Sequence, residues 1–323
     1  MAANSFLTGA ELTEAVGRLK APSRRPDGDE RRREDFMSPL FSAWLGDRLE
    51  ARLKSHPDWE KCEPVALGSW ARGDLCPKSD IDLLFCGDEE AVRRLTQDFS
   101  RQGLKIRYRM PANPEDWTQG VLPFDVLALF SGVPLTTVAG EKHRTQLERI
   151  HERGAGFRRE LLKAMIEERQ ARAARYDSIS NFLEPNLKYG SGGLRDLEQA
   201  LVTWDLFPEK FEGPQHALDV LLYYKRFLLL VRQKLHLSQG AGDILSAPEQ
   251  RPISDWLGFT DPKDFMREIQ KGVSRVSFYA DWVVEQASRP AAVVQSVSNR
   301  RLTKIADLFH AIEQDSSTLM QNH

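Results

Sequence analysis

The chain has 323 residues, of which 41% are hydrophobic and 28% are charged, and its formal net charge is −2. This length is sufficient for one large domain or two modest domains, each with a hydrophobic core. A nearly neutral chain lacks the general positive field on which non-specific nucleic-acid binding depends, which argues against a nucleic-acid partner.

The cysteines and the apolar segments indicate a cytoplasmic protein. All three cysteines lie between residues 62 and 86 without a paired metal-ligand spacing, so we interpret them as idle thiols of a reducing compartment. The amino terminus carries no basic-then-apolar signal region. The most apolar helix candidate, residues 217–237, is interrupted by basic side chains, which argues against a membrane partner.

The first predicted elements are a flexible arm and a helix. Residues 1–33 combine a short helical pattern with a polar segment at 22–30, which is typical of a mobile linker. A helix is predicted up to about Ser55, because Leu45, Leu49 and Leu53 recur at helical spacing.

Residues 34–140 are then expected to form a small α/β domain. Short apolar runs predict strands at 64–67, 81–85, 104–108 and 124–130, with a helix near 89–101. Because proline cannot donate a hydrogen bond within a sheet, Pro123 is expected at the start of the last strand.

Strand patterns fade after residue 141, and long helical patterns replace them. Helices are predicted at 157–175, 194–206, 215–237, 262–287 and 299–314. We interpret 141–290 as a helical bundle that binds substrate or nucleotide, and 291–323 as a C-terminal helical tail. The predicted fold class is α+β, with a small α/β domain followed by an all-α bundle.

Two aspartates form the strongest candidate for catalysis. Asp80 and Asp82 stand two residues apart at the head of the apolar run 81–85, so both side chains should project from one face of a strand. Two-metal phosphoryl transfer needs carboxylates that hold two cations about 3.5–4 Å apart, and Mg²⁺ or Mn²⁺ suits such ligands. Asp125, at the head of the predicted strand 124–130, is the candidate for a third ligand. The alternative places Asp125 at an exposed strand entrance beside a turn.

A loop upstream of these aspartates has the residues that a phosphate site needs. Gly68 permits close backbone approach, and Ser69 offers a hydroxyl group. Arg72 and Lys78 flank the loop and could neutralise phosphate charge. A glycine-serine turn is common, however, and both basic residues are equally compatible with solvated surface charge.

Two blocks of sequence resemble one known family. The first block, residues 68–84, reads GSWARGDLCPKSDIDLL and resembles the nucleotidyltransferase core of the bacterial PII-protein uridylyltransferases. The second block, residues 185–197, reads PNLKYGSGGLRDL and is similar to the segment with which that family enters its helical domain. The resemblance spans about residues 60–285. It implies a polymerase-β-like nucleotidyltransferase domain, NTP as substrate with UTP favoured, and a tyrosine hydroxyl of a PII-like protein as acceptor.

Within the second block, charged residues suggest two roles. Lys188 and Arg195 are candidates for nucleotide contact, whereas Asp196 favours a structural salt bridge. The alternative is that Arg195 itself makes an inter-domain salt bridge with a core carboxylate. Three aromatic residues at 223, 224 and 227 are better explained as bundle core than as a base-stacking platform.

The chain also departs from the family pattern. Full-length members continue into a hydrolase domain with an adjacent His-Asp pair and into regulatory domains, whereas this chain has no His-Asp dipeptide. We therefore expect nucleotidyl removal to be absent. Ser69 and Ala71 also stand where the family usually has glycines. The alternatives to protein modification are a nucleotide-binding regulator without transferase activity, and transfer to a small molecule or to RNA, as in CCA-adding polymerases.

Overall fold

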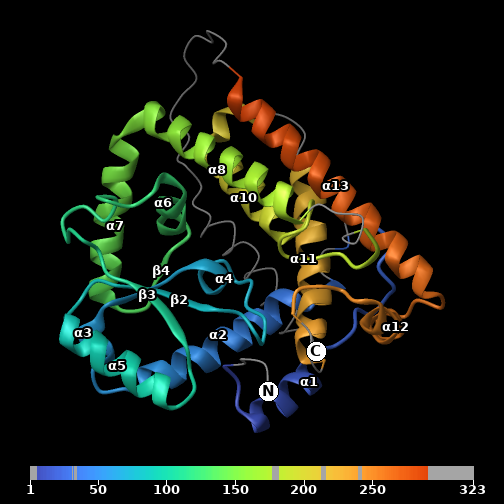
Figure 1. Cartoon of the computed structure of the whole chain (residues 1–323), viewed down its shortest axis with the longest axis horizontal. Helices are drawn as coiled ribbons and strands as arrows, with labels where there is room; N and C mark the ends of the chain where they lie inside the picture. The colour runs from blue at the N-terminus through green and yellow to red at the C-terminus, as the bar shows by residue number, and fades with distance from the viewer. Residues whose placement is uncertain are drawn as a thin grey trace. The chain divides into compact units, whose positions relative to one another are not determined.

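The computed structural model describes residues 6–30, 32, 35–176, 182–211, 216–238 and 242–289 (Figure 1). Contacts divide the chain into two compact units. The sheet unit comprises Met1–Leu19 and Ser38–Leu161, and the helical unit comprises Lys20–Met37 and Leu162–His323. The predicted tail at 291–323, with its helix at 299–314, lies outside the described residues.

A four-stranded sheet with the order β3-β2-β1-β4 organises the sheet unit. Its strands are β1 (Pro64–Ala66), β2 (Ile81–Phe85), β3 (Ile106–Arg109) and β4 (Val133–Pro134). β1 runs antiparallel to β2 and β4, whereas β2 and β3 are parallel. The mixed α and β character predicted from the sequence is therefore confirmed. Among the described residues β3 is an edge strand, with β2 on one side and no strand on the other.

Helices surround this sheet within the same unit. They are α1 (Gly9–Arg18), α2 (Ser38–Lys54), α3 (Trp59–Cys62), α4 (Gly68–Ala71), α5 (Glu89–Arg101), α6 (Pro123–Phe130) and α7 (Thr137–Glu152). α5 contacts β3, and α7 contacts both β1 and β4. α2 confirms the predicted helix, because Leu45, Leu49 and Leu53 at helical spacing are all almost fully buried.

The prediction of a strand at 124–130 is wrong, since α6 occupies this segment. An apolar run of this length fits a buried helix as well as a buried strand, so its periodicity does not separate the two. Two features favour the helix: Pro123 stands at the first helical positions, where its missing N–H costs nothing, and Asp125 lies in the first turn. The fourth strand is instead the short β4, which follows α6 and pairs with β1.

Long helices build the helical unit. α8 (Gly154–Tyr176) begins in the sheet unit and ends here, followed by α10 (Leu194–Leu206), a 3₁₀ turn at Pro208–Lys210, α11 (His216–Leu237), α12 (Ala247–Trp256) and α13 (Pro262–Ser288). α13 contacts α10, α11 and α12. Tyr223, Tyr224 and Phe227 are almost fully buried on α11, which confirms their prediction as core. Among the described residues, no helix combines the length and apolar character that crossing a membrane requires.

The segment predicted as a linker contacts helices of its own unit. The backbone N–H of Gly28 donates to the Tyr223 hydroxyl at 2.9 Å, and the Arg25 guanidinium lies 5.5 Å from the centre of the Phe259 ring. Phe36 stacks edge-on against Tyr223 at 5.2 Å between ring centres. The flexibility of residues 1–33 stays a prediction.

Candidate active site

Asp80 and Asp82 lie at the start of β2, as the sequence predicts. Asp80 immediately precedes the strand and Asp82 is its second residue. Side chains alternate along a strand, so these two carboxylates share a face, while Ile81 and Leu83 are buried on the other. Asp80 is exposed and Asp82 is half-buried. The structure thus offers two neighbouring carboxylates to solvent at the start of a buried strand.

The Gly68 turn lies directly against Asp82. Gly68 has φ +60, and a Cβ added there would stand 2.7 Å from Oδ2 of Asp82. The backbone N–H of Leu67 also donates to the Asp82 carbonyl oxygen at 2.9 Å. Only glycine accommodates both the left-handed backbone and this close carboxylate. The sequence predicted the turn from its composition, and the structure shows that Asp82 is the side chain that requires a glycine there.

Contacts of Ser69 and Arg72 with Asp74 close the loop that follows α4. The Ser69 carbonyl oxygen accepts a hydrogen bond from the Asp74 backbone at 2.7 Å, which closes the loop after α4. The Arg72 guanidinium lies 3.4 Å from the buried Asp74 carboxylate. Lys78 is half-buried. Arg72 therefore helps to hold the loop closed, and phosphate binding by Ser69, Arg72 and Lys78 stays a prediction.

Asp125 reaches the same region from a helix and not from a strand. It stands in the first turn of α6, and both its carboxylate oxygens lie 3.1 Å from the Arg109 guanidinium on β3. In the part of the chain that the structure describes, no three His, Cys, Asp or Glu side chains are grouped so that they could hold a metal ion. The three predicted ligands therefore do not form one cluster in this structure.

The sequence analysis missed two arginines of β3. Arg107 pairs in register with Asp82 across the parallel strands, and its guanidinium lies 2.9 Å from Asp80. Arg109 holds Asp125. Their spacing of two residues in the run IRYR places both on one face of a strand. This spacing is the feature of the sequence from which they could have been predicted.

The donor set at Asp80 and Asp82 fits a magnesium or manganese ion. Mg²⁺ is usually held by one or two protein carboxylates, with substrate phosphates and water completing its shell, so a cluster of three protein ligands is not required. The two carboxylates share a face and are accessible to solvent. Arg107 pairs with Asp80 on this face, so a cation that binds Asp80 has to displace that guanidinium group.

The second block forms a tight, hydrogen-bonded turn in the helical unit. The Asn186 side chain accepts hydrogen bonds from the backbone N–H groups of Lys188 and Tyr189 at 3.0 and 2.8 Å. Gly192, at φ +71, meets the carbonyl oxygen of Val273 on α13 where a Cβ would be. Contacts within the helical unit therefore explain why an asparagine stands at 186 and a glycine at 192.

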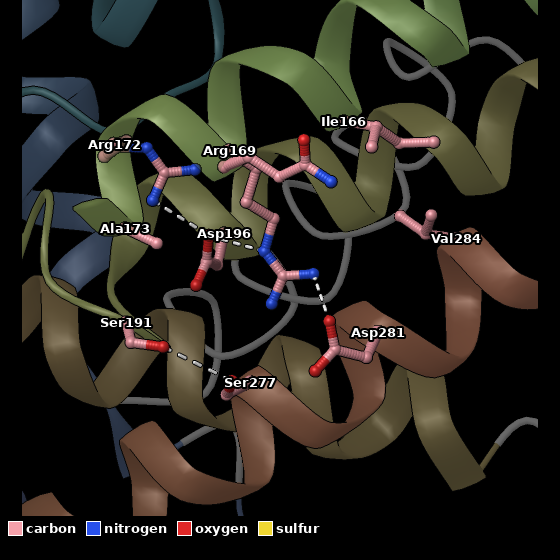
Figure 2. Close-up of a pocket in the computed structure, with 10 residues that line it drawn as sticks. Ile166, Arg169, Arg172, Ala173, Ser191, Asp196, Ser277, Asp281 and Val284 are labelled. Carbon is pink, nitrogen blue, oxygen red and sulfur yellow. Dashed lines mark hydrogen bonds and ion pairs between the residues drawn. The ribbon is translucent and has the colours of Figure 1, made fainter. Parts of the chain in front are cut away.

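Asp196 is the most deeply buried charge of the second block (Figure 2). Its Oδ1 lies 3.1 Å from Arg169 and 2.9 Å from Arg172, both on α8, and its Oδ2 accepts the Gly192 N–H at 2.7 Å. Arg169 also reaches Asp281 of α13 at 2.6 Å. This network lines a cavity of about 310 Å³ and ties α8, α10 and α13 together. The expected structural salt bridge of Asp196 is present, with partners that the sequence did not identify.

Lys188 and Arg195 have partners inside the helical unit. The Lys188 ammonium lies 4.9 Å from the centre of the Tyr189 ring, and Arg195 pairs with Glu198 on its own helix at 2.8 Å. Arg195 thus has a local partner at i,i+3, and its bridge to a core carboxylate of the other domain stays a prediction. Nucleotide contact by Lys188 and Arg195 remains a prediction.

Comparisons with known proteins agree with the resemblance of the two blocks. Residues 160–208, which include the second block, match the family model described as GlnD PII-uridylyltransferase. The chain is 29% identical over 273 residues to the bifunctional uridylyltransferase/uridylyl-removing enzyme of Pseudomonas entomophila, covering 75% of this chain and 30% of that protein. The enzyme of the same name from Xanthomonas campestris pv. campestris is 30% identical over 279 residues, covering 78% and 30%. The chain therefore spans about 30% of the length of these relatives.

Proposed function

We propose that this chain, whose resemblance to the PII-uridylyltransferases is confirmed by these relatives, transfers NMP from an NTP to a hydroxyl group. The observation that carries the proposal is the placement of Asp80 and Asp82 on one face of β2, with the Gly68 turn against Asp82. The sheet unit then serves as a nucleotidyltransferase domain of the polymerase-β-like kind. UTP is the first nucleotide to test, because the relatives are named uridylyltransferases.

In this reaction the acceptor oxygen bonds to the α-phosphorus of the NTP. The bond from that phosphorus to the β-phosphate oxygen breaks, pyrophosphate leaves, and the hydroxyl proton passes to solvent. Asp80 and Asp82 would hold the divalent cations, and Asp125 is proposed as a third ligand. Bound Mg²⁺ or Mn²⁺ supplies charge neutralisation at the phosphates and activation of the attacking oxygen.

Other residues of this chain would position the triphosphate. The Gly68 turn allows the backbone to approach the phosphates closely, and the Ser69 hydroxyl can donate to a phosphate oxygen. Arg72 and Lys78 flank this loop with positive charge. Lys188 and Arg195 are proposed to contact the nucleotide from the helical unit.

A protein hydroxyl is the proposed acceptor, with a tyrosine of a PII-like protein as first choice. The family description, GlnD PII-uridylyltransferase, supports this choice. With a labelled NTP, transfer to a small molecule or to RNA would put the label on that molecule and not on a protein.

The ion pairs at the site favour a second candidate, a nucleotide-binding regulatory protein without transferase activity. Asp80 and Asp125 each pair with an arginine of β3, and no cluster of three metal ligands occurs among the described residues. A guanidinium that stayed on Asp80 would exclude a cation from that carboxylate. Such a protein would bind NTP and release no pyrophosphate.

The test is transfer of label from each of the four α-³²P-labelled NTPs, with the full chain, a purified PII-like protein and, separately, cell lysate. We expect labelled protein with one NTP, and loss of more than about 10³-fold with Asp82→Asn, since its carboxylate is proposed to hold the cations. Glu90→Gln, an exposed acid on α5, is the matched control and should stay active. Transfer that survives Asp82→Asn, or NTP binding without pyrophosphate release for any acceptor, would contradict the proposal.

A further inference from the structure

Two arginines stand beside the proposed catalytic carboxylates on the neighbouring strand. β3 runs parallel to β2, and Arg107 is the register partner of Asp82. Arg109 follows two residues later, so both arginine side chains share the face that carries Asp80 and Asp82. The two guanidinium groups therefore lie at the site and not on a remote surface.

Each arginine is paired with one proposed metal ligand. Nη1 of Arg107 lies 2.9 Å from Oδ2 of Asp80. The Arg109 guanidinium reaches both oxygens of Asp125, with Nη2 and Nη1 each at 3.1 Å. Asp80 and Asp125, both proposed for cation binding, are thus each paired with an arginine side chain in this structure.

These ion pairs are weak enough to be exchanged. The side chains of Arg107 and Arg109 are 61% and 57% exposed, and those of Asp80 and Asp125 are 44% and 33% exposed. Exposed ion pairs contribute about 0–1 kcal/mol, because water screens the charges and holding long side chains costs entropy. A divalent cation that brings its own phosphate ligands can therefore displace the guanidinium groups.

The displaced arginines would find a suitable new partner in the nucleotide. A guanidinium group presents a planar fork of N–H donors that matches two oxygens of a phosphate. A triphosphate placed beside Asp80 and Asp82 carries several negative oxygens into the same region. Each arginine would then exchange one carboxylate for phosphate oxygens within the reach of its own side chain.

We propose that Arg107 and Arg109 are nucleotide-binding residues that hold Asp80 and Asp125 in the free protein and transfer to the triphosphate when the cation takes the carboxylates. This inference rests on the proposed function, since it assigns the triphosphate to that site. It predicts two opposite effects of one substitution. Removing the positive charge at 107 takes away a competitor of the cation and also a ligand of the nucleotide.

The experiment measures both affinities on the full chain. Mn²⁺ binding without nucleotide is followed by electron paramagnetic resonance. Nucleotide binding is followed by calorimetry with Mg-UTP, or with the magnesium complex of another NTP if that NTP is the one that gives transfer. Arg107→Gln is expected to bind Mn²⁺ about two- to fivefold more tightly, which is the loss of a pair worth up to about 1 kcal/mol. Nucleotide binding is expected to weaken about tenfold or more, as for a charge-assisted hydrogen bond. Arg109→Gln should change both affinities in the same directions.

Two further variants separate this role from a structural one. Arg107→Lys keeps the charge but lacks the planar fork, so it should weaken nucleotide binding without strengthening Mn²⁺ binding. Arg101→Gln removes an exposed arginine that pairs with Asp98 on α5, and it should change neither affinity. Circular dichroism of each variant reports whether the fold is kept, and if Arg107→Gln does not fold, Arg107→Lys and Arg109→Gln carry the test.

The outcomes distinguish this inference from the proposed function. Opposite shifts in the two affinities support the arginine exchange, even if the wild-type chain transfers no nucleotide, which would overturn only the transferase assignment. Unchanged or weaker Mn²⁺ binding in both glutamine variants, or unchanged nucleotide binding in both, would overturn the exchange. Transfer activity that persists together with such a result would leave the transferase proposal standing.

Discussion

The two sequence blocks carry similar charged residues, but the structure places them in opposite environments. In the first block, Asp80 is exposed and its partner Arg107 is more exposed still. In the second block, Asp196 is almost fully buried, and two arginines and a backbone N–H satisfy its carboxylate. An exposed, weakly paired carboxylate can accept a cation or a substrate. A buried carboxylate whose partners are all in place can only hold helices together.

Burial therefore separates the charges of the two blocks that can take part in chemistry from those that stabilise the fold. Both blocks follow the pattern of one family, and the family model covers the second of them. Asp80 and Asp82 of the first block are accessible. In the second block, Asp196 links α8, α10 and α13 through its ion pairs and the pair between Arg169 and Asp281.

Asp196→Ala should cause the largest loss of stability. It removes the carboxylate shared by Arg169 and Arg172, whose side chains are only 17% and 5% exposed. Among the described residues, the two guanidinium groups then keep only the more exposed carboxylates of Asp281 and Glu168 as acidic partners. We expect a decrease of about 3–5 kcal/mol in the free energy of unfolding, measured by urea denaturation. Asp281→Asn is the matched control, because Asp281 pairs with the same Arg169 but is 70% exposed. A similar loss in both variants would contradict the division between buried and exposed pairs.

Gly192→Ala should cause the second largest loss of stability. The new methyl group would overlap the Val273 carbonyl oxygen on α13, and the residue would keep φ +71. Left-handed strain costs about 1–3 kcal/mol and overpacking a similar amount, so we expect a loss of about 2–4 kcal/mol by thermal or urea unfolding. Gly258→Ala has the same kind of backbone, φ +81, with nothing within 4 Å of a Cβ. Gly258→Ala should therefore lose only the stability that the backbone strain costs. Equal losses in Gly192→Ala and Gly258→Ala would show that the Val273 contact contributes nothing.

Gly68→Ala should affect the proposed activity more than stability. A Cβ at this position would stand 2.7 Å from the Asp82 carboxylate and push it from its place. Displacing a reacting group by about 1 Å can cost about 10²-fold in rate, and we expect a loss of this order in nucleotide transfer. Gly73→Ala lies in the same loop at φ +65 with open space around it, and serves as the control. Equal activity of the two variants would show that the Asp82 contact has no part in the reaction.

Asp205→Asn should give the smallest effect, and one that depends on pH. Burial raises the pKa of the Asp205 carboxyl on α10 from 3.8 to about 7. Its contribution to stability is therefore complete below pH 4 and is lost as the pH rises towards 7, because the folded state resists ionisation. The neutral asparagine removes this loss, which would be about 4 kcal/mol at pH 8 for the full shift in pKa. Because Asp205 is only partly buried and water screens its charge, we expect the variant to be more stable than wild type by about 1 kcal/mol at pH 8 and equal at pH 4.

The measurement for Asp205 is the melting temperature at the two pH values. A gain of about 2–4 °C at pH 8 corresponds to the expected change. Asp255→Asn on α12 removes an acid that is 53% exposed, and should show no such dependence. A constant difference between Asp205→Asn and wild type from pH 4 to pH 8 would mean that Asp205 ionises normally.

Much of the local structure follows from the sequence because it depends on short-range patterns. Leucines at helical spacing predicted α2, and the apolar run after Asp80 predicted β2 with both aspartates on one face. α10, α11 and α13 begin and end within a residue or two of their predicted limits. In each case neighbours along the chain determine which side of the element is buried.

The tertiary structure decided what depends on partners that are distant in sequence. The segment 124–130 became a helix, because a short continuous apolar run does not distinguish a strand from a helix and Pro123 favours a helix start. Likewise, the pairing of Arg107 with Asp80, of Arg109 with Asp125, and of two α8 arginines with Asp196 joins elements that only folding brings together. A sequence shows which charges exist, whereas the distance between them, and hence whether a carboxylate is available or already paired, is fixed by the packing of the elements that carry them.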